Sequence, residues 1–118
     1  MNQMRGGIMY NQREIVLIPF PYSDLSASKL RPALIISNKK INKNEDRICC
    51  LITSNPTNDG ILLSKEDFEG GKLPFKSWVK PYRLFTVNSK IIRKNLCSVK
   101  IKFHDKILEE INSFLRVL

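Results

Sequence analysis

The chain has 118 residues, of which 42% are hydrophobic, and its 20 lysines and arginines against 11 acidic residues give a formal net charge of +9. A chain of this length is typical of a single domain, and no apolar run approaches the ~20 residues of a membrane span. The excess of positive charge favours a polyanionic partner, an acidic protein or an anionic surface; a merely soluble basic protein is the alternative.

The N-terminal segment MNQMRGGIMYNQRE contains no apolar core of the kind that signal peptides have, so we expect a cytoplasmic protein that does not enter a membrane. We interpret residues 1–13 as a flexible N-terminal leader and residues 14–118 as one domain. Met1 and Met9 both stay open as the start of translation.

Six short segments, rich in β-branched residues, predict strands at 14–20, 32–37, 47–53, 60–64, 76–85 and 96–102. Turn-forming residues at 55–60 and 69–71 separate some of them, and single helical turns are expected at 39–44 and 88–94. Near the C-terminus the period changes to that of a helix, with Asp105 expected in the first turn. The apolar stripe of this helix should pack on the sheet: Phe103, Ile107, Leu108, Ile111, Phe114, Leu115 and Leu118. Strands followed by one helix predict a mainly β fold, a small curved sheet or barrel with a C-terminal helix.

The three cysteines predict neither a disulfide framework nor a zinc site. Cys49 and Cys50 are adjacent and should face opposite sides of a strand, and Cys97 is distant from both. With one histidine and no C-x-x-C pair, the ligand set for structural zinc is missing. We therefore expect buried, reduced thiols, and neither a metal nor a cofactor.

Arg31 is the residue that most suggests a binding function. It ends a polar loop between the first two predicted strands, and Pro32 biases it toward an extended backbone. A planar, permanently charged guanidinium at such a position suits phosphate binding. The alternative is an ordinary surface ion pair.

The other catalytic candidates are few. A histidine pair is impossible, and His104 at the start of the predicted helix should be a surface or capping residue. The carboxylates of Asp24, Asp59 and residues 66–67 are scattered over loops, which argues against a two-metal nuclease. Gly70-Gly71 is most simply a turn.

Three groups of residues follow one another along the chain: PFPYSD and KLRPALIISN (19–24 and 29–38), LITSN (51–55) and SWVKPYRLFT (77–86). Together they resemble the motifs of the PemK/MazF toxins of bacterial toxin–antitoxin systems, from residue 14 to the C-terminus. The resemblance implies a small SH3-like β-barrel, shared with CcdB-type toxins, that usually forms a homodimer.

The resemblance also implies that Arg31 and Thr53 form the active site of a metal-independent endoribonuclease. RNA carries its own nucleophile, the 2′-hydroxyl, so the protein has to stabilise the charge that develops on the phosphorus oxygens. Arg31 can donate two hydrogen bonds to those oxygens and could act as a weak general acid, whereas a guanidinium is a poor general base. The general base stays unassigned. For Thr53 the alternative is a β-forming strand residue without a role.

Residues around this pair are candidates for substrate binding. Lys29 suits a phosphate contact, and Asp24 could orient Arg31 or be a solvated loop carboxylate. Ser54 follows Thr53 in the second motif, and Arg83 is either a phosphate contact or a structural ion-pair residue.

The third motif departs from the family pattern, because many relatives carry an arginine and an aspartate where this chain has Lys80 and Tyr82. Lys80 keeps the charge but loses the bidentate fork. Tyr82 brings a ring that could stack on a base, or it could be a half-buried strand residue. Trp78 is more simply explained by core packing or a dimer contact.

These observations predict a sequence-selective toxin that cleaves single-stranded mRNA without a metal, leaving 2′,3′-cyclic phosphate and 5′-hydroxyl ends. A small acidic antitoxin should neutralise it. Two alternatives are a non-catalytic nucleic-acid-binding barrel and a protein-binding toxin of the same fold that acts on a topoisomerase. The cleavage sequence cannot be read from the chain, because it depends on loop geometry.

Overall fold

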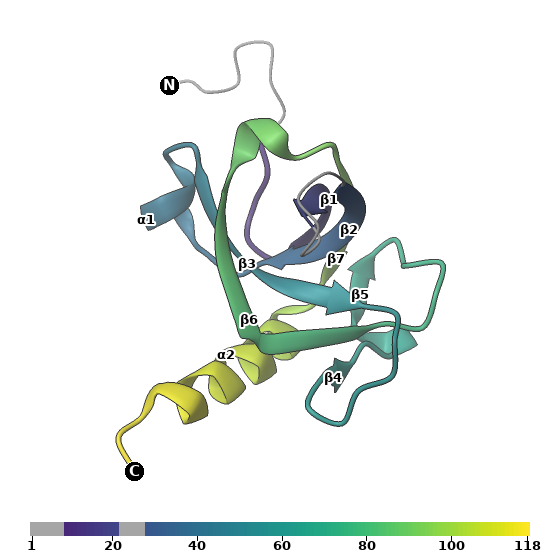
Figure 1. The fold of residues 1–118 in the computed structure, drawn as a ribbon, viewed down its shortest axis with the longest axis vertical. Helices are drawn as coiled ribbons and strands as arrows, with labels where there is room; N and C mark the ends of the chain where they lie inside the picture. Colours follow the sequence, from purple (N-terminus) through teal and green to yellow (C-terminus); the bar gives the residue numbers. More distant parts are fainter. Residues whose placement is uncertain (1–8, 22–27) are drawn as a thin grey trace.

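The computed structural model describes residues 9–21 and 28–118. Its strands form one antiparallel sheet in the order β4-β6-β3-β2-β1-β7-β5, which curls into a half-barrel in Figure 1. The predicted mainly β fold with a C-terminal helix is confirmed. The elements are β1 (Glu14–Pro21), β2 (Ser28–Ile35), α1 (Lys39–Asn42), β3 (Asp46–Thr53), β4 (Ile61–Leu62), β5 (Phe68–Gly70), β6 (Trp78–Asn88), β7 (Lys94–Val99) and α2 (Ile101–Leu115).

The strand boundaries differ from prediction at several places. β2 begins at Ser28, four residues before the predicted start, because the β1 register continues from Ile15↔Leu34 to Pro21↔Ser28. Arg31 therefore lies inside a strand, not at the mouth of a loop. The prediction missed β5, and β4 is shorter than predicted, since both are edge strands whose pairing depends on distant partners. Lys100 caps α2, so residues 101–102 are helical and the predicted last strand was too long.

Alternation along the central strands builds two hydrophobic clusters on opposite faces of the sheet. The helix-side cluster lies between the sheet and α2, and includes Ile15, Leu34, Cys50, Ile52, Val79, Phe103, Ile107 and Ile111. The opposite cluster contains Tyr10, Val16, Ile18, Ala33, Ile35, Cys49 and Ile92. The neighbours Cys49 and Cys50 thus face opposite sides, as predicted. All three cysteines are free and buried, and burial raises the pKa of the Cys49 and Cys50 thiols to about 12.

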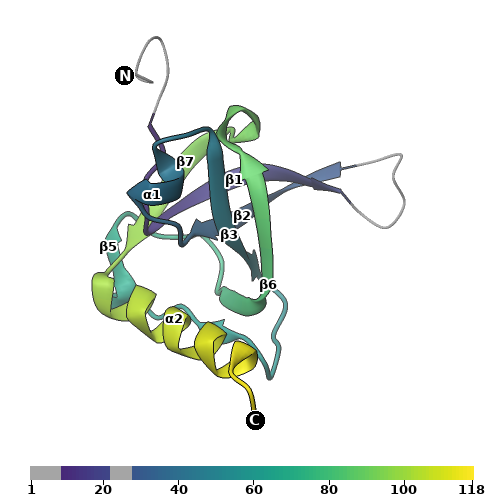
Figure 2. The ribbon, with the colours of Figure 1, turned by 90° about the vertical axis from the view of Figure 1, so that its left-hand side faces the viewer.

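Helix α2 crosses one side of the sheet, and the β1–β2 hairpin extends away from the other parts of the molecule in Figure 2. The helix buries Phe103, Ile107 and Ile111, but the rest of the predicted stripe was assigned wrongly to the core. Four of its residues are exposed, namely Leu108, Phe114, Leu115 and Leu118. Asp105 also falls beyond the first turn, which holds no acidic residue, because the helix starts at Ile101. Within the residues described, no helix is long and apolar enough to span a membrane.

The segment before β1 is packed on the domain from Tyr10 onward, and the rest of the predicted leader, residues 1–8, lies outside the described residues. Tyr10 is buried, and its carbonyl accepts a hydrogen bond of 2.8 Å from Nε of the buried Arg47. Arg13 has a left-handed backbone (φ 77°), unusual for a residue with a Cβ. Its guanidinium donates to the Val99 carbonyl at 2.7 Å, which ties the entry of β1 to the end of β7.

His104 is buried, so its assignment to the surface or to a helix cap was wrong. The helix begins at Ile101, three residues before the histidine, so His104 lies within it. The Nε2 atom of the ring lies 3.3 Å from the Ile36 carbonyl oxygen. Burial lowers the pKa of His104 below its usual 6.5, and Arg13 adds to this, whereas the Ile36 contact and Asp105 oppose it. The ring is therefore neutral in the folded protein near neutral pH.

We expect the free energy of unfolding to fall as the pH drops below about 6.5. Below that pH the unfolded chain binds a proton at His104 more readily than the folded chain does. The contribution of His104 to the free energy of unfolding is therefore complete above the unfolded pKa, and it is lost as the pH falls toward the lower folded pKa. Urea unfolding between pH 5 and 8 measures this, with His104→Gln as the non-titrating control. A His104→Gln protein that loses stability just as steeply between these pH values would contradict the assignment.

Candidate functional site

The pairing of β2 with β3 brings Arg31 and Thr53 to adjacent positions. The observed register pairs Ala33 with Leu51 and Ile35 with Cys49. Continued by one more alternation, it sets Arg31 directly across from Thr53 on the same face of the sheet. Side chains at directly opposed positions have Cβ atoms about 4.5–5.5 Å apart. The register therefore brings together two residues that are 22 positions apart in sequence, Arg31 inside β2 and Thr53 at the end of β3.

Thr53 is held in a defined environment. Its side chain is buried, with 8% exposed, and its Oγ1 accepts a hydrogen bond of 3.1 Å from the backbone N–H of Asn55. A hydroxyl that accepts one bond still has its proton to donate. The turn after β3 thus orients the hydroxyl and leaves its donor available.

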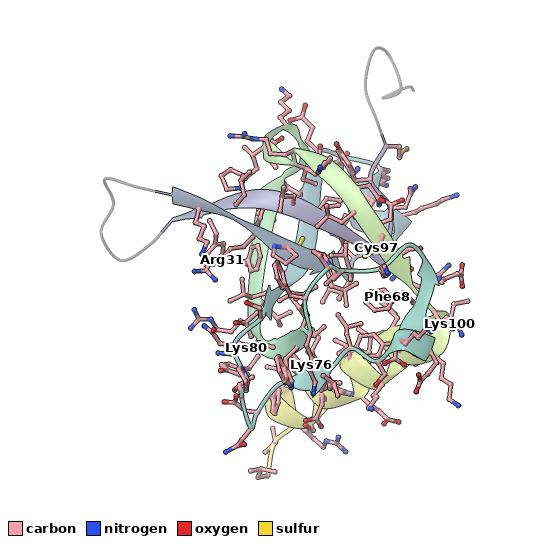
Figure 3. All side chains as sticks on the ribbon, turned by 90° about the vertical axis from the view of Figure 1, so that its right-hand side faces the viewer. Arg31, Phe68, Lys76, Lys80, Cys97 and Lys100 are labelled. Carbon is pink, nitrogen blue, oxygen red and sulfur yellow. The ribbon has the colours of Figure 1, made fainter. Side chains whose placement is uncertain are left out.

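Strand β6 adds a second cationic side chain to the same face. Lys80 pairs with Leu51 and Trp78 pairs with Thr53. Figure 3 shows Arg31 and Lys80 on the same side of the molecule, Arg31 from β2 and Lys80 from β6. Trp78 is half-buried, and the ammonium of Lys76 lies 5.9 Å from the centre of its ring. Lys80 of β6 therefore joins Arg31 as a cationic side chain on the face that carries Thr53.

Tyr82 is engaged with protein groups on several sides. The Lys80 ammonium lies 5.7 Å from the centre of its ring, and its edge meets the Phe114 ring of α2 with centroids 6.4 Å apart. Its side chain also hydrogen-bonds Asp59. The pKa of that carboxyl is lowered, first by the Thr57 hydroxyl and further by Tyr82 and Lys80. Tyr82 thus links the β3–β4 turn, β6 and the C-terminal helix, while 42% of it stays exposed.

The remaining predicted residues divide between a cavity and open surface. An open cavity of about 390 Å³ is bordered by Lys29, Arg31 and Ser54, whereas Thr53 does not border it. Arg83 is exposed on β6. Asp24 lies outside the described residues. Among residues 9–21 and 28–118, no three His, Cys, Asp or Glu side chains gather as a metal-binding group.

Two residues of this cavity were missed by sequence reasoning, namely Lys94 at the start of β7 and Phe75 in the segment before β6. Phe75 follows Pro74 in a loop and is 73% exposed. An aromatic residue beside a proline in a polar turn is a weak signal that could have pointed to it. Nothing in the sequence places Lys94, because β7 reaches this cavity only by pairing with β1.

Solved structures share this fold over most of the chain. A MazE–MazF complex from Deinococcus radiodurans matches with a TM-score of 0.75 and 16% identity, over 92% of this chain and 97% of that one. An endoribonuclease in complex with its cognate antitoxin, from a mycobacterial species, matches with a TM-score of 0.73 and 16% identity, over 92% and 99%. The Mycobacterium tuberculosis toxin MazF-mt6 has a TM-score of 0.62 and 13% identity, over 83% and 93%.

No curated protein sequence matches the chain. A family model does: the PemK-like, MazF-like toxins of type II toxin–antitoxin systems match residues 11–115. This range includes all three motifs, β1 to β7 and the whole of α2. The chain belongs to the PemK-like, MazF-like family of type II toxin–antitoxin toxins.

Proposed function

We propose that this protein is an endoribonuclease toxin that cleaves single-stranded RNA without a metal. The observation that carries the proposal is the register of β2 on β3, which pairs Ala33 with Leu51 and, continued by one alternation, brings Arg31 across from Thr53. Family membership and the net charge of +9 support it, because RNA is the polyanion that such a surface would meet. Similar structures include proteins described as endoribonucleases.

In the proposed reaction the 2′-hydroxyl oxygen of a ribose attacks the adjacent phosphorus. A bond forms between that oxygen and phosphorus, the bond to the 5′-oxygen breaks, and a 2′,3′-cyclic phosphate and a 5′-hydroxyl result. Arg31 donates two hydrogen bonds to the phosphorane oxygens, and the Thr53 hydroxyl donates a third. The leaving 5′-oxygen needs a proton, for which Arg31 is the nearest candidate, and the base that takes the 2′-proton is unassigned.

Incubation of the purified protein with a long natural RNA in excess chelator tests the proposal. We expect discrete cuts whose 5′-hydroxyl ends accept phosphate from polynucleotide kinase without prior phosphatase treatment. A non-catalytic RNA-binding barrel would shift the RNA in a gel and leave it whole. A toxin that acts on a topoisomerase would leave the RNA whole and inhibit DNA supercoiling. Mapping the cut ends also gives the cleavage sequence.

We further propose an acidic antitoxin and a homodimer as the physiological assembly in the cytoplasm. Similar structures include complexes of a toxin with its antitoxin, and a basic surface would attract an acidic partner by electrostatic steering. RNA binding across a joint surface should weaken steeply as salt rises, because phosphate contacts release counterions. Light scattering at micromolar concentration tests the dimer, and a fully active monomer would contradict it.

Tyr82→Ala should lower thermal stability, because the ring loses its edge contact with Phe114, and aromatic pairs contribute about 0.5–1.5 kcal/mol. If the ring also stacks on a base, RNA affinity should fall by roughly 1–3 kcal/mol, and Tyr82→Phe should be nearly silent. Phe114→Ala is the matched control, since it removes the same ring contact and keeps the tyrosine. Melting temperature and RNA affinity are measured on the same samples. Equal affinities for Tyr82→Ala and Phe114→Ala would exclude stacking.

A further inference from the structure

The cavity beside Arg31 has an apolar interior. It lies between the ends of β2 and β3, the start of β7 and residues 73–77, and its volume of about 390 Å³ falls in the ~300–1,000 Å³ range of small-ligand sites. Leu30 and Pro32, the neighbours of Arg31 in β2, also border it. Its buried and half-buried apolar lining comes from four strands, with Leu17, Pro32, Ile52 and Leu96. Such a lining favours a flat, uncharged group.

The border of the cavity is positively charged. Lys29 and Arg31 stand on β2 and Lys94 on β7, so cations approach the opening from two sides of the cavity. Its described lining residues include no aspartate or glutamate. An apolar interior with cations at its border fits an uncharged ring that is covalently attached to anionic groups. A nucleotide in a single-stranded RNA has this combination.

Phe75 offers a stacking surface at the opening. Its side chain is 73% exposed, although the backbone beneath it is fixed. The buried Ser77 donates a hydrogen bond of 2.8 Å from its Oγ to the Phe75 carbonyl, and the Ser77 carbonyl accepts one of 3.0 Å from the Leu63 N–H. An exposed aromatic ring on an anchored backbone is suited to stack on an unpaired base.

We propose that this cavity binds one unstacked base of single-stranded RNA, with Phe75 stacking on the base and Lys94 contacting a flanking phosphate. The proposal rests on the proposed function, since Arg31 borders the cavity and would hold the neighbouring phosphate. Phe75 and Lys94 thereby become specificity-determining residues, because a cavity of limited size selects the base next to the cut. An apolar protein side chain fits the interior but does not account for the cations around it.

The test measures RNA affinity on protein that carries Thr53→Val, so that the RNA stays uncut. The probe is a short single-stranded RNA labelled with a fluorophore. Phe75→Ala should weaken binding roughly 5- to 150-fold, whereas Phe75→Tyr should stay within about threefold, because a ring of either kind can stack. Lys94→Ala should weaken binding and flatten its salt dependence. Leu115→Ala is the matched control, an equally exposed apolar side chain that does not line the cavity, and it should change nothing.

Abasic nucleotides placed one at a time along the probe identify the bound base. In protein with the native Phe75, the abasic substitution at one position of the probe should lower RNA affinity. In Phe75→Ala the same substitution should have no further effect, because the missing base and the missing ring remove the same contact. Equal affinities for Phe75→Ala and Leu115→Ala would overturn the base site and leave an apolar protein segment as its occupant. Failure of the proposed function has a different signature, because binding and the abasic effect would persist while protein with the native Thr53 left RNA uncut in chelator.

Discussion

Arg31→Ala should abolish RNA cleavage, with a loss of roughly a thousandfold or more, while the fold survives. The guanidinium supplies two of the proposed hydrogen bonds to the phosphorane oxygens, and arginines in such positions contribute factors of about 10³–10⁵ to phosphoryl transfer. The side chain is half-buried on β2 and belongs to neither hydrophobic cluster. Initial cleavage rates in chelator, with circular dichroism and melting temperature on the same preparation, measure both parts of this expectation.

Arg31→Lys and Arg116→Ala are the matched controls. The lysine keeps the charge but cannot donate two parallel hydrogen bonds, so we expect an intermediate rate. Arg116 is exposed beyond the end of α2, and its loss changes the net charge by the same amount as Arg31→Ala, so it should leave the rate unchanged. A folded Arg31→Ala protein that cuts RNA as fast as Arg116→Ala would refute the role of Arg31.

Thr53→Val should lower the cleavage rate by on the order of a hundredfold or more, because it removes one donor to the developing charge. RNA binding should change much less, since the hydroxyl acts in the transition state. The valine also leaves the Asn55 N–H without its acceptor, which should cost about 1 kcal/mol of folding stability. Single-turnover rates and affinities, determined separately, distinguish these effects.

Thr53→Ser is the rescue control, because it restores the hydroxyl that both bonds Asn55 and donates to the substrate. It should recover most of the cleavage rate and most of the melting temperature. If the rate of Thr53→Val falls only in step with its RNA affinity, Thr53 is a contact residue without a catalytic role. A drop in melting temperature with an unchanged rate would assign it to the β3 turn alone.

Local patterns in the sequence predicted much of the fold correctly, for a physical reason. Side chains alternate along a strand, so adjacent Cys49 and Cys50 had to face different clusters, and they do. The 3.6-residue period of the C-terminal segment likewise predicted α2 and its buried Phe103, Ile107 and Ile111. The motifs around Arg31 and Thr53 indicated the family, because they combine specific residues at a specific spacing.

The tertiary structure decided what depends on partners distant in sequence. The helical periodicity did not indicate that His104 is buried. Its ring contacts the Ile36 carbonyl oxygen because the helix starts at Ile101. The contact of Tyr82 with Phe114 joins β6 to the last turn of α2, and no local pattern relates the two. The cavity at Phe75 arises only when β7 pairs with β1 and brings Lys94 to the border that Arg31 also lines. Residue type and spacing act over a few positions of the chain, so the sequence alone indicates the helices, the strands and their apolar faces. Which side chains are buried and where cavities form depends on which of these faces meet, so only the folded chain determines them.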